Sequence, residues 1–252
     1  MTTSILHAYD REMRSDPPLE PGEIVERVDG LVRVRGSHNL IIYSRLAAKD
    51  VAAGVAKQAA FFREAGEPVE WKLYEHDRPA NLAEALETNG FEPDERETLM
   101  VLDLTRTIEF AASPEVDVRA VRTPSELDTY AAVSERAFGP QEKTAAADLA
   151  VRIFGKGAST IASIAYVDGR AAAAGRLELP NDRSFASMWG GGTDPDLRKR
   201  GVYRTLVAER ARAARERGYA YLTVDALDTS RPILERLGFA PLTTVRAWNF
   251  VP

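Results

Sequence analysis

The sequence predicts an α/β (α+β) fold, in which a mixed, mostly antiparallel sheet is flanked by helices on both faces and divided between two related lobes. Three observations support this prediction. Segments with strand-like alternation are interspersed with segments of helical apolar spacing. Asp168-Gly169, between two strand patterns, is a two-residue hairpin signal that opposes an all-parallel sheet. The order helix, strand, helix, Gly-Phe pair and strand occurs twice along the chain.

Local patterns in the second half define each element. Thr123 and Pro124 provide an N-cap and a first-turn proline for the first helix, and Gly218 closes a long helix as its C′ residue. The predicted strands are residues 116–121, 159–167, 171–179, 184–189, 219–224 and 243–250. The predicted helices are residues 124–138, 145–154, 202–217 and 231–237.

The first half repeats the end of this order. The predicted elements are a helix over 47–65, a strand over 69–74, a helix over 79–88 and a strand over 98–104. Gly90-Phe91-Glu92-Pro93 also parallels Gly238-Phe239-Ala240-Pro241. We interpret the match as an internal duplication. It predicts a degenerate N-terminal lobe over 1–110, without the opening strand and helices, and a C-terminal domain over 111–252.

The composition excludes several classes of protein. The 252 residues carry a formal net charge of -5, which argues against general nucleic-acid binding. The chain has no cysteine, so disulfides, thiolate nucleophiles and cysteine-ligated metals are excluded. His7, His38 and His76 show no metal-ligand spacing. No signal peptide and no apolar run of roughly 20 residues is found, so we expect a cytoplasmic protein without metal or membrane partners.

A basic segment in the second half predicts an anion site. Gly190-Gly191-Gly192-Thr193-Asp194-Pro195 reads as a glycine-rich turn after a strand, and Arg198-Lys199-Arg200-Gly201-Val202-Tyr203 then opens the long helix. Backbone N–H groups and the helix dipole favour an anion there, and the basic side chains add full charges. The first half has no glycine at the equivalent segment, residues 43–49. We therefore expect one such site per chain, suited to a pyrophosphate.

The second half resembles the GCN5-related N-acetyltransferase (GNAT) superfamily over about residues 116–252. Arg198-x-x-Gly201-x-Tyr203 is similar to the family's acyl-CoA motif, Arg/Gln-x-x-Gly-x-Gly/Ala, and Leu234 to Phe239 looks like its last helix and Gly-Phe turn. The element order extends the resemblance to tandem, two-repeat members of the superfamily.

The resemblance implies acetyl-CoA as cosubstrate and direct attack of an amine on its thioester. It places the acetyl group where the strands 184–189 and 219–224 splay apart. The implied cofactor-binding residues are those of the motif loop, the preceding strand, the following helix and a last-helix hydroxyl: Arg198, Lys199, Arg200, Gly201, Val202, Tyr203, Gly191, Gly192, Thr193, Arg204 and Ser230.

Two departures from the family pattern bear on catalysis. Tyr203 replaces a small residue, so its side chain must point away from the phosphates. Leu234 stands where many members carry a tyrosine acid, four residues before the Gly-Phe glycine. The sequence therefore leaves open which residue protonates the leaving thiolate, although a thiolate leaves readily without an acid.

Three side chains are candidates for proton transfer. Glu178, late in a strand, is a candidate base, with a solvated strand-end carboxylate as the alternative. Asp225 lies near the expected amine entry or acts as a turn residue, and Tyr203 is a candidate acid or a core tyrosine. Ser230 is better explained as the N-cap of the last helix.

Together these features predict an acetyl-CoA-dependent N-acetyltransferase acting on an amine of a small molecule. The alternatives are a non-catalytic acyl-CoA sensor or scaffold, which Leu234 motivates, and a protein or peptide N-acetyltransferase. The sequence leaves a homodimer open and does not identify the acceptor.

Overall fold

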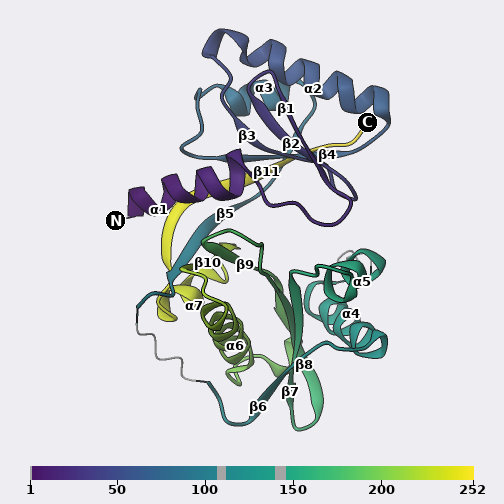
Figure 1. Ribbon diagram of the computed structural model, residues 1–252, viewed down its shortest axis with the longest axis vertical. Coiled ribbons are helices and arrows are strands. Elements are labelled where there is room, and N and C mark those ends of the chain that lie inside the picture. Colours follow the sequence, from purple (N-terminus) through teal and green to yellow (C-terminus); the bar gives the residue numbers. More distant parts are fainter. Residues whose placement is uncertain (1, 107–111, 140–145) are drawn as a thin grey trace. The chain divides into compact units, whose positions relative to one another are not determined.

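The computed structural model describes residues 2–106, 112–139 and 146–252 (Figure 1). The chain divides into two compact units. Unit 1 comprises Met1–Met100, Asp225–Arg231 and Pro241–Pro252, and unit 2 comprises Val101–Val224 and Pro232–Ala240. The predicted lobe boundary at residues 110 and 111 lies outside the described residues, so the 1–110 and 111–252 lobes stay a prediction.

The α/β fold class predicted from the sequence is confirmed. Antiparallel pairs dominate: β1–β2, β2–β3, β4–β11, β6–β7, β7–β8 and β8–β9. Two strand pairs are parallel, β3–β4 and β9–β10, and each is joined through a helix of 15 residues, as a parallel connection requires.

Unit 1 is a sheet with helices on both faces, and its strand order is β1-β2-β3-β4-β11-β5. Val69 and Trp71 of β4 contribute to a core under the helices α2 and α3, whereas Tyr74 meets Tyr9 of α1 with ring centroids 6.3 Å apart. Its elements are α1 (Thr2–Tyr9), the π-helical turn η1 (Asp10–Ser15), β1 (Ile24–Val28), β2 (Leu31–Arg35), β3 (Leu40–Ser44), the 3-10 turn η2 (Ala48–Asp50), α2 (Val51–Ala65), β4 (Val69–Tyr74), α3 (Leu82–Thr88), the first part of β5 (Glu92–Asp103) and most of β11 (Ala240–Phe250).

The first half contains more elements than the sequence interpretation predicted. Residues before β4 form α1 and the antiparallel strands β1, β2 and β3. Asp29 and Gly30 make the β1–β2 turn with φ of 51° and 81°, much as Asp168 and Gly169 do in unit 2 with 52° and 76°. The Asp-Gly pair was therefore a readable hairpin signal. The alternation of valines with arginines over residues 32–35 was a readable strand signal as well.

Unit 2 carries its strands in the order β10-β9-β8-β7-β6, with α4 and α5 on one face and α6 on the other (Figure 1). The predicted cap of α4 is confirmed: the Thr123 hydroxyl accepts a hydrogen bond from the backbone N–H of Glu126, and the Glu126 carboxylate accepts one from the backbone N–H of Thr123. Its elements are β6 (Val116–Ala120), α4 (Pro124–Phe138), α5 (Ala146–Phe154), β7 (Thr160–Val167), β8 (Arg170–Glu178), β9 (Phe185–Thr193), the 3-10 turn η3 (Pro195–Leu197), α6 (Val202–Glu216), and most of β10 (Tyr221–Ala226) and α7 (Arg231–Arg236).

The prediction of a glycine-rich turn over Gly190 to Pro195 is wrong for its glycines, because Gly190, Gly191 and Gly192 lie inside β9. They leave room for neighbouring helices. A Cβ atom on Gly192 would lie 2.5 Å from the Phe138 ring of α4, and one on Gly191 would lie 3.0 Å from Nη2 of Arg210 on α6. Gly190 has φ of 56°, at an irregularity in the β8–β9 register. The run therefore serves close helix–sheet packing and a bulge.

Candidate functional site

The connection between β9 and α6, residues 194–201, turns through two left-handed residues. Lys199 has φ of 66° and Gly201 has φ of 78°. Gly201 is the N-cap of α6, and no side chain makes a capping hydrogen bond there. The first backbone N–H groups of α6 thus have no intrahelical acceptor and no side-chain cap, which is the arrangement that receives an anion.

Asp194 fixes the start of this connection. Its side chain is buried, and Oδ2 lies 2.9 Å from Arg136 Nε and 3.1 Å from Arg170 Nη2. Its Oδ1 accepts a hydrogen bond from the backbone N–H of Asp196 at 3.1 Å. Burial raises the pKa of this carboxyl, but the hydrogen bonds from Arg136 and Asp196 and the nearby Arg170 charge outweigh it, so the pKa lies below its usual value. Asp194 therefore braces the connection as a carboxylate.

The basic residues of the motif differ in their partners. Arg198 donates from Nε to the Thr193 carbonyl at 3.2 Å, and Arg200 pairs with Asp168 at 2.9 Å. Lys199 and Arg204 are exposed, and within the described ranges neither has a hydrogen-bond or ion-pair partner. The two unpaired cations are thus the ones available to an incoming anion.

The strand before the connection has one open edge. β10 pairs in parallel with β9 over only three residues, Tyr221–Thr223 with Phe185–Ser187. β9 continues to Thr193 and keeps its antiparallel pairing with β8, where Gly192 faces Ala174 and Thr193 faces Ala173. In the described part of unit 2, the β10-facing edge of β9 beyond Ser187 therefore has no strand partner. An extended ligand finds free backbone groups there.

Tyr203 lies on α6 with its ring against β9. Its Cε2 atom would be 3.3 Å from a Cβ atom on Gly191. Burial raises the pKa of the Tyr203 phenol, and the charge of Arg210 only partly offsets that effect. The phenol is therefore fully protonated at neutral pH, as a catalytic acid must be, but its contact with Gly191 is equally that of a packed tyrosine.

Arg210 was missed by the sequence interpretation. Its guanidinium is buried between α6 and the sheet, donates from Nε to Leu206 O at 3.2 Å and from Nη1 to Arg176 O at 3.3 Å, and leaves Nη2 without a partner. Burial lowers its pKa. The signal was its position on the apolar face of α6, four residues after Leu206. An arginine is admitted there because Gly175 and Gly191 have no side chains.

Glu178, the predicted base, sits in a cluster of charged and polar groups. Its Oε1 lies 2.6 Å from Arg152 Nη2 and 3.1 Å from Arg176 Nε. The Ser187 hydroxyl donates to Oε2 at 3.4 Å and accepts from the Trp189 indole at 2.9 Å. The carboxylate is mostly buried and points toward β9, so it is no solvated strand end. The two guanidinium groups fix the position of the Glu178 side chain.

Asp225 and Ser230 pack with unit 1, whereas the other predicted site residues lie in unit 2. Asp225 Oδ2 and Lys72 Nζ are 2.5 Å apart and both side chains are largely buried. Burial lowers the pKa of Lys72, but Asp225 outweighs burial and the net pKa is raised. Ser230 donates its hydroxyl to the Leu227 carbonyl at 3.1 Å. Both residues thus have local structural partners in unit 1.

The search for metal and membrane sites covers only the described residues. Among them, no group of three or more His, Asp or Glu side chains is placed to hold a metal ion. His76 lies 2.9 Å from Asp10 Oδ2 and His38 lies 3.2 Å from Glu70 Oε2. No helix in these ranges combines the length and the apolar character needed to cross a bilayer.

Comparison with known proteins agrees with this geometry. Residues 127–239 match the model of the acetyltransferase (GNAT) family, and this range contains β8, β9, the 194–201 connection and α6. The match supports the GNAT resemblance and acetyl transfer as the general activity; the family generally uses acetyl-CoA. Among curated proteins, none matches this sequence.

Solved structures match over nearly the whole chain. A GCN5-related N-acetyltransferase from Kribbella flavida superposes with a TM-score of 0.71 at 17% identity, over 98% of this chain and 93% of that one. A GCN5-related N-acetyltransferase from Sphaerobacter thermophilus superposes with a TM-score of 0.64 at 12% sequence identity, over 98% of this chain and 84% of that one. A tandem GNAT protein from the clavulanic acid biosynthesis pathway superposes with a TM-score of 0.64 at 14% sequence identity, over 99% of this chain and 93% of that one. At these identities the likeness shows the fold.

Proposed function

We propose that this protein is an acetyl-CoA-dependent N-acetyltransferase that acetylates an amine of a small molecule, with acetyl-CoA bound by unit 2. The observation that carries the proposal is the 194–201 connection, where Lys199 and Gly201 adopt left-handed torsions directly before the uncapped N-terminus of α6. A Cβ atom on Gly201 would lie 3.3 Å from Arg204 Nη2, so glycine also keeps the approach to the N–H groups open.

The residues present fit the donor. The backbone N–H groups of residues 200–204 would hold the pyrophosphate, with Lys199 and Arg204 adding charge. Arg198 and Arg200 hold the connection in shape through Thr193 and Asp168. The open β9 edge at Gly191, Gly192 and Thr193 would pair with the amides of the pantetheine arm. The donor supplies the thioester that the amine attacks.

Within unit 2, Glu178 is the proposed proton acceptor. An ammonium group first loses one proton to give the free amine; the amine nitrogen then bonds to the acetyl carbon, the carbon–sulfur bond breaks, and a second proton leaves the nitrogen as the thiolate departs. Arg152 and Arg176 fix the position of the Glu178 side chain through Oε1, and Oε2, which accepts a hydrogen bond from the Ser187 hydroxyl, is the oxygen proposed to accept the proton. Tyr203 is the proposed acid. Asp225 and Ser230 belong to unit 1, and we propose only a structural role for them there.

We further propose that the two units arose by duplication. The order β1-β2-β3-α2-β4-α3-β5 recurs as β7-β8-β9-α6-β10-α7-β11. The first copy supplies no acetyl-CoA loop in this proposal. A cytoplasmic location suits a chain without cysteine that uses acetyl-CoA. A homodimer stays a prediction.

Binding is tested by thermal unfolding with acetyl-CoA. At a hundred times the Kd the ligand adds about 2.7 kcal/mol of stability, which raises the Tm by about 5 to 10 °C for a chain of this size. Lys199→Ala combined with Arg204→Ala should weaken binding about tenfold, because two charge contacts are lost. Arg212→Ala, at an exposed arginine of the same helix, is the matched control. No Tm rise for the wild type at millimolar acetyl-CoA contradicts the proposal.

Turnover is tested by release of the CoA thiol across a panel of small amines and basic peptides. The chain has no cysteine, so a thiol reagent detects only the thiol of the released CoA. Thiol release with a small amine supports the proposal. Binding without release for any amine or peptide indicates a sensor, and release with peptides alone indicates a protein acetyltransferase. Glu178→Gln should lower kcat about a hundredfold with little change in acetyl-CoA affinity; an unchanged kcat assigns Glu178 to structure.

A further inference from the structure

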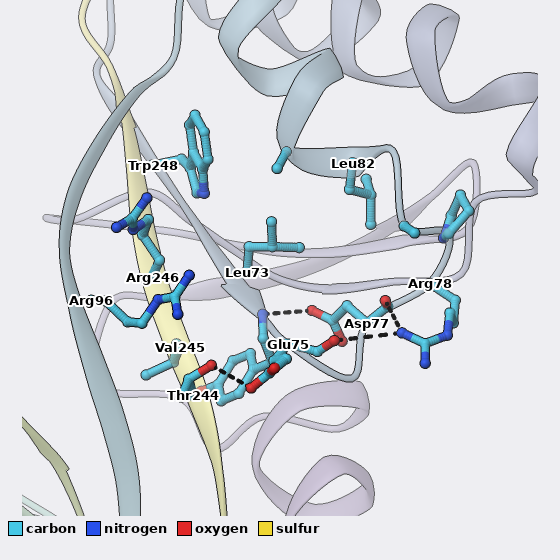
Figure 2. Close-up of a pocket in the computed structure, with 14 residues that line it drawn as sticks. Leu73, Glu75, Asp77, Arg78, Leu82, Arg96, Thr244, Val245, Arg246 and Trp248 are labelled. Carbon is cyan, nitrogen blue, oxygen red and sulfur yellow. Dashed lines mark hydrogen bonds between the residues drawn. The ribbon is translucent and has the colours of Figure 1, made fainter.

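Unit 1 contains a cavity of about 260 Å³ on the α3 side of β4 and β11 (Figure 2). Leu73 of β4 lies on its floor, and Leu82 of α3 closes one wall. The turn after β4, residues 75–80, forms the opposite rim. None of these residues belongs to the 194–201 connection, so this cavity is separate from the proposed acetyl-CoA site in sequence and in fold.

Two buried donors line this cavity without an acceptor. Trp248 is 5% exposed, and its indole Nε1 has no hydrogen-bond partner. The buried Nε of Arg246 has none either. In the β4–β11 ladder Arg246 faces Leu73 and Trp248 faces Trp71, so both side chains project from the same face of the sheet. A buried donor without an acceptor costs free energy, and these two donors call for an acceptor that the described residues do not provide.

The charges around the cavity favour an anion. Figure 2 shows the guanidinium groups of Arg96 and Arg246 and the indole nitrogen of Trp248 gathered on one side. Across the described ranges of the chain, neither Arg96 nor Arg246 has an ion-pair partner.

The two carboxylates at the rim are already satisfied. Asp77 receives both Nη2 contacts of Arg14 at 2.7 Å, together with the Tyr74 backbone N–H. Glu75 receives the Thr244 hydroxyl at 2.7 Å. The charge of Asp77 is thus matched by Arg14, and the guanidinium groups of Arg78, Arg96 and Arg246 outnumber the remaining Glu75 carboxylate in the lining.

We propose that this cavity binds a small molecule with one anionic group, a carboxylate or phosphate, attached to an apolar body. The anionic group accepts hydrogen bonds from the Trp248 indole and from the guanidinium groups of Arg246 and Arg96. The apolar body packs on Leu73, Leu82 and Ala83. A cavity of this size takes a ring or a short branched chain beside the anionic group.

The indole N–H resonance of Trp248 tests this proposal directly. The chain has three tryptophans, and Trp248→Phe identifies the resonance of Trp248 by its loss. Benzoate and phenyl phosphate, titrated to millimolar concentration, should shift this resonance saturably. Benzyl alcohol and benzylamine, which share the ring but lack the anion, should leave it in place. Comparing the two anions separates a carboxylate from a phosphate site. Trp189 of unit 2 serves as internal reference.

Substitutions separate the site from nonspecific anion effects. Arg96→Ala, at an exposed side chain, should weaken binding about tenfold and leave the fold intact. Arg45→Ala, at an exposed arginine of unit 1 outside the cavity, should not. The proposal is overturned if neither anion shifts the Trp248 resonance, if benzyl alcohol shifts it equally, or if Arg45→Ala and Arg96→Ala weaken binding alike.

Discussion

The connections from β3 to α2 and from β9 to α6 share a framework of buried residues but differ in the charges they expose. Each places a buried leucine five residues before its helix, Leu46 before α2 and Leu197 before α6, and each begins its helix with a buried valine. In unit 1 the N-cap is Asp50, in an ordinary right-handed conformation. In unit 2 it is Gly201, in the left-handed conformation.

The difference shows how few residues convert a structural turn into an anion site. In unit 1 the four residues after Leu46 run into a 3-10 turn, and the Asp50 carboxylate stands where an anion would have to come. In unit 2 the four residues after Leu197 bring in three cations and two left-handed torsions. The helix dipole is common to both, so it cannot by itself decide which connection binds.

The comparison predicts its largest effect when the N-cap residue of α6, Gly201, is replaced by aspartate, the N-cap residue of α2. Gly201→Asp forces a side chain into a left-handed conformation and adds negative charge at the phosphate position. We expect acetyl-CoA affinity to fall at least about a hundredfold, measured by titration calorimetry. Gly218→Asp, at the other end of α6 with φ of 85° and open space around it, carries the same strain and should keep the affinity.

Loss of the buried Asp194 carboxylate should have the next largest effect. Asp194→Ala leaves Arg136 and Arg170 without their shared carboxylate, and we expect a loss of about 2 kcal/mol in the free energy of unfolding, measured with urea. Acetyl-CoA affinity should fall with it. Asp196→Ala, an exposed neighbour 3.8 Å from Arg170, should change stability by less than about 0.5 kcal/mol. Equal losses in the two variants would contradict the role given to Asp194.

The helices after the connections offer a third comparison, since α2 buries Ala59 where α6 buries Arg210. Gly191→Ala should cost about 1 to 2 kcal/mol of stability, because its Cβ atom would lie 3.0 Å from Arg210 Nη2. In an Arg210→Ala background the same change should cost less than about 0.5 kcal/mol. A double-mutant cycle from thermal unfolding measures this coupling, and additive losses would show that Arg210 does not set the need for glycine.

The pH dependence of stability should have opposite signs in the two units. The lowered pKa of Asp194 gives stability that is present above its unfolded value, about 3.9, and is lost as the pH falls through the folded value. In unit 1, burial and the charge of Asp225 raise the pKa of Glu97 to about 7. Its contribution is present below the unfolded pKa of about 4.3 and is lost as the pH rises through 7.

Glu97→Gln isolates that smallest effect. It should flatten the decline in unfolding free energy between roughly pH 5 and 8, by about 1 kcal/mol after allowance for solvent screening of a partly exposed group. Denaturant titrations across this range measure the change. A decline identical in wild type and variant would remove Glu97 as its source.

The sequence predicted the second half of the fold better than the first. Thr123, Pro124 and Asp168-Gly169 act through local backbone chemistry, so their helix and hairpin could be inferred directly. The strands β1 to β3 were missed although valine and arginine alternate over residues 32–35 and Asp29-Gly30 gives the same turn signal as Asp168-Gly169.

Within the candidate site, too, local features could be predicted and long-range contacts could not. Gly201 before a long helix is a local signal and was found from the sequence. Arg210 and the pairing of Asp194 with Arg136 depend on contacts across 34 and 58 residues of chain, which spacing alone does not reveal. The glycines of β9 were misread as a turn because glycine permits a turn and close helix packing equally well.

The central claim is that one connection of the two binds acetyl-CoA. Isothermal titration of the whole chain with acetyl-CoA measures the number of sites, and the proposal predicts one per chain, abolished by Gly201→Asp and retained in Gly218→Asp. A stoichiometry of two, or one site that survives Gly201→Asp, would contradict it.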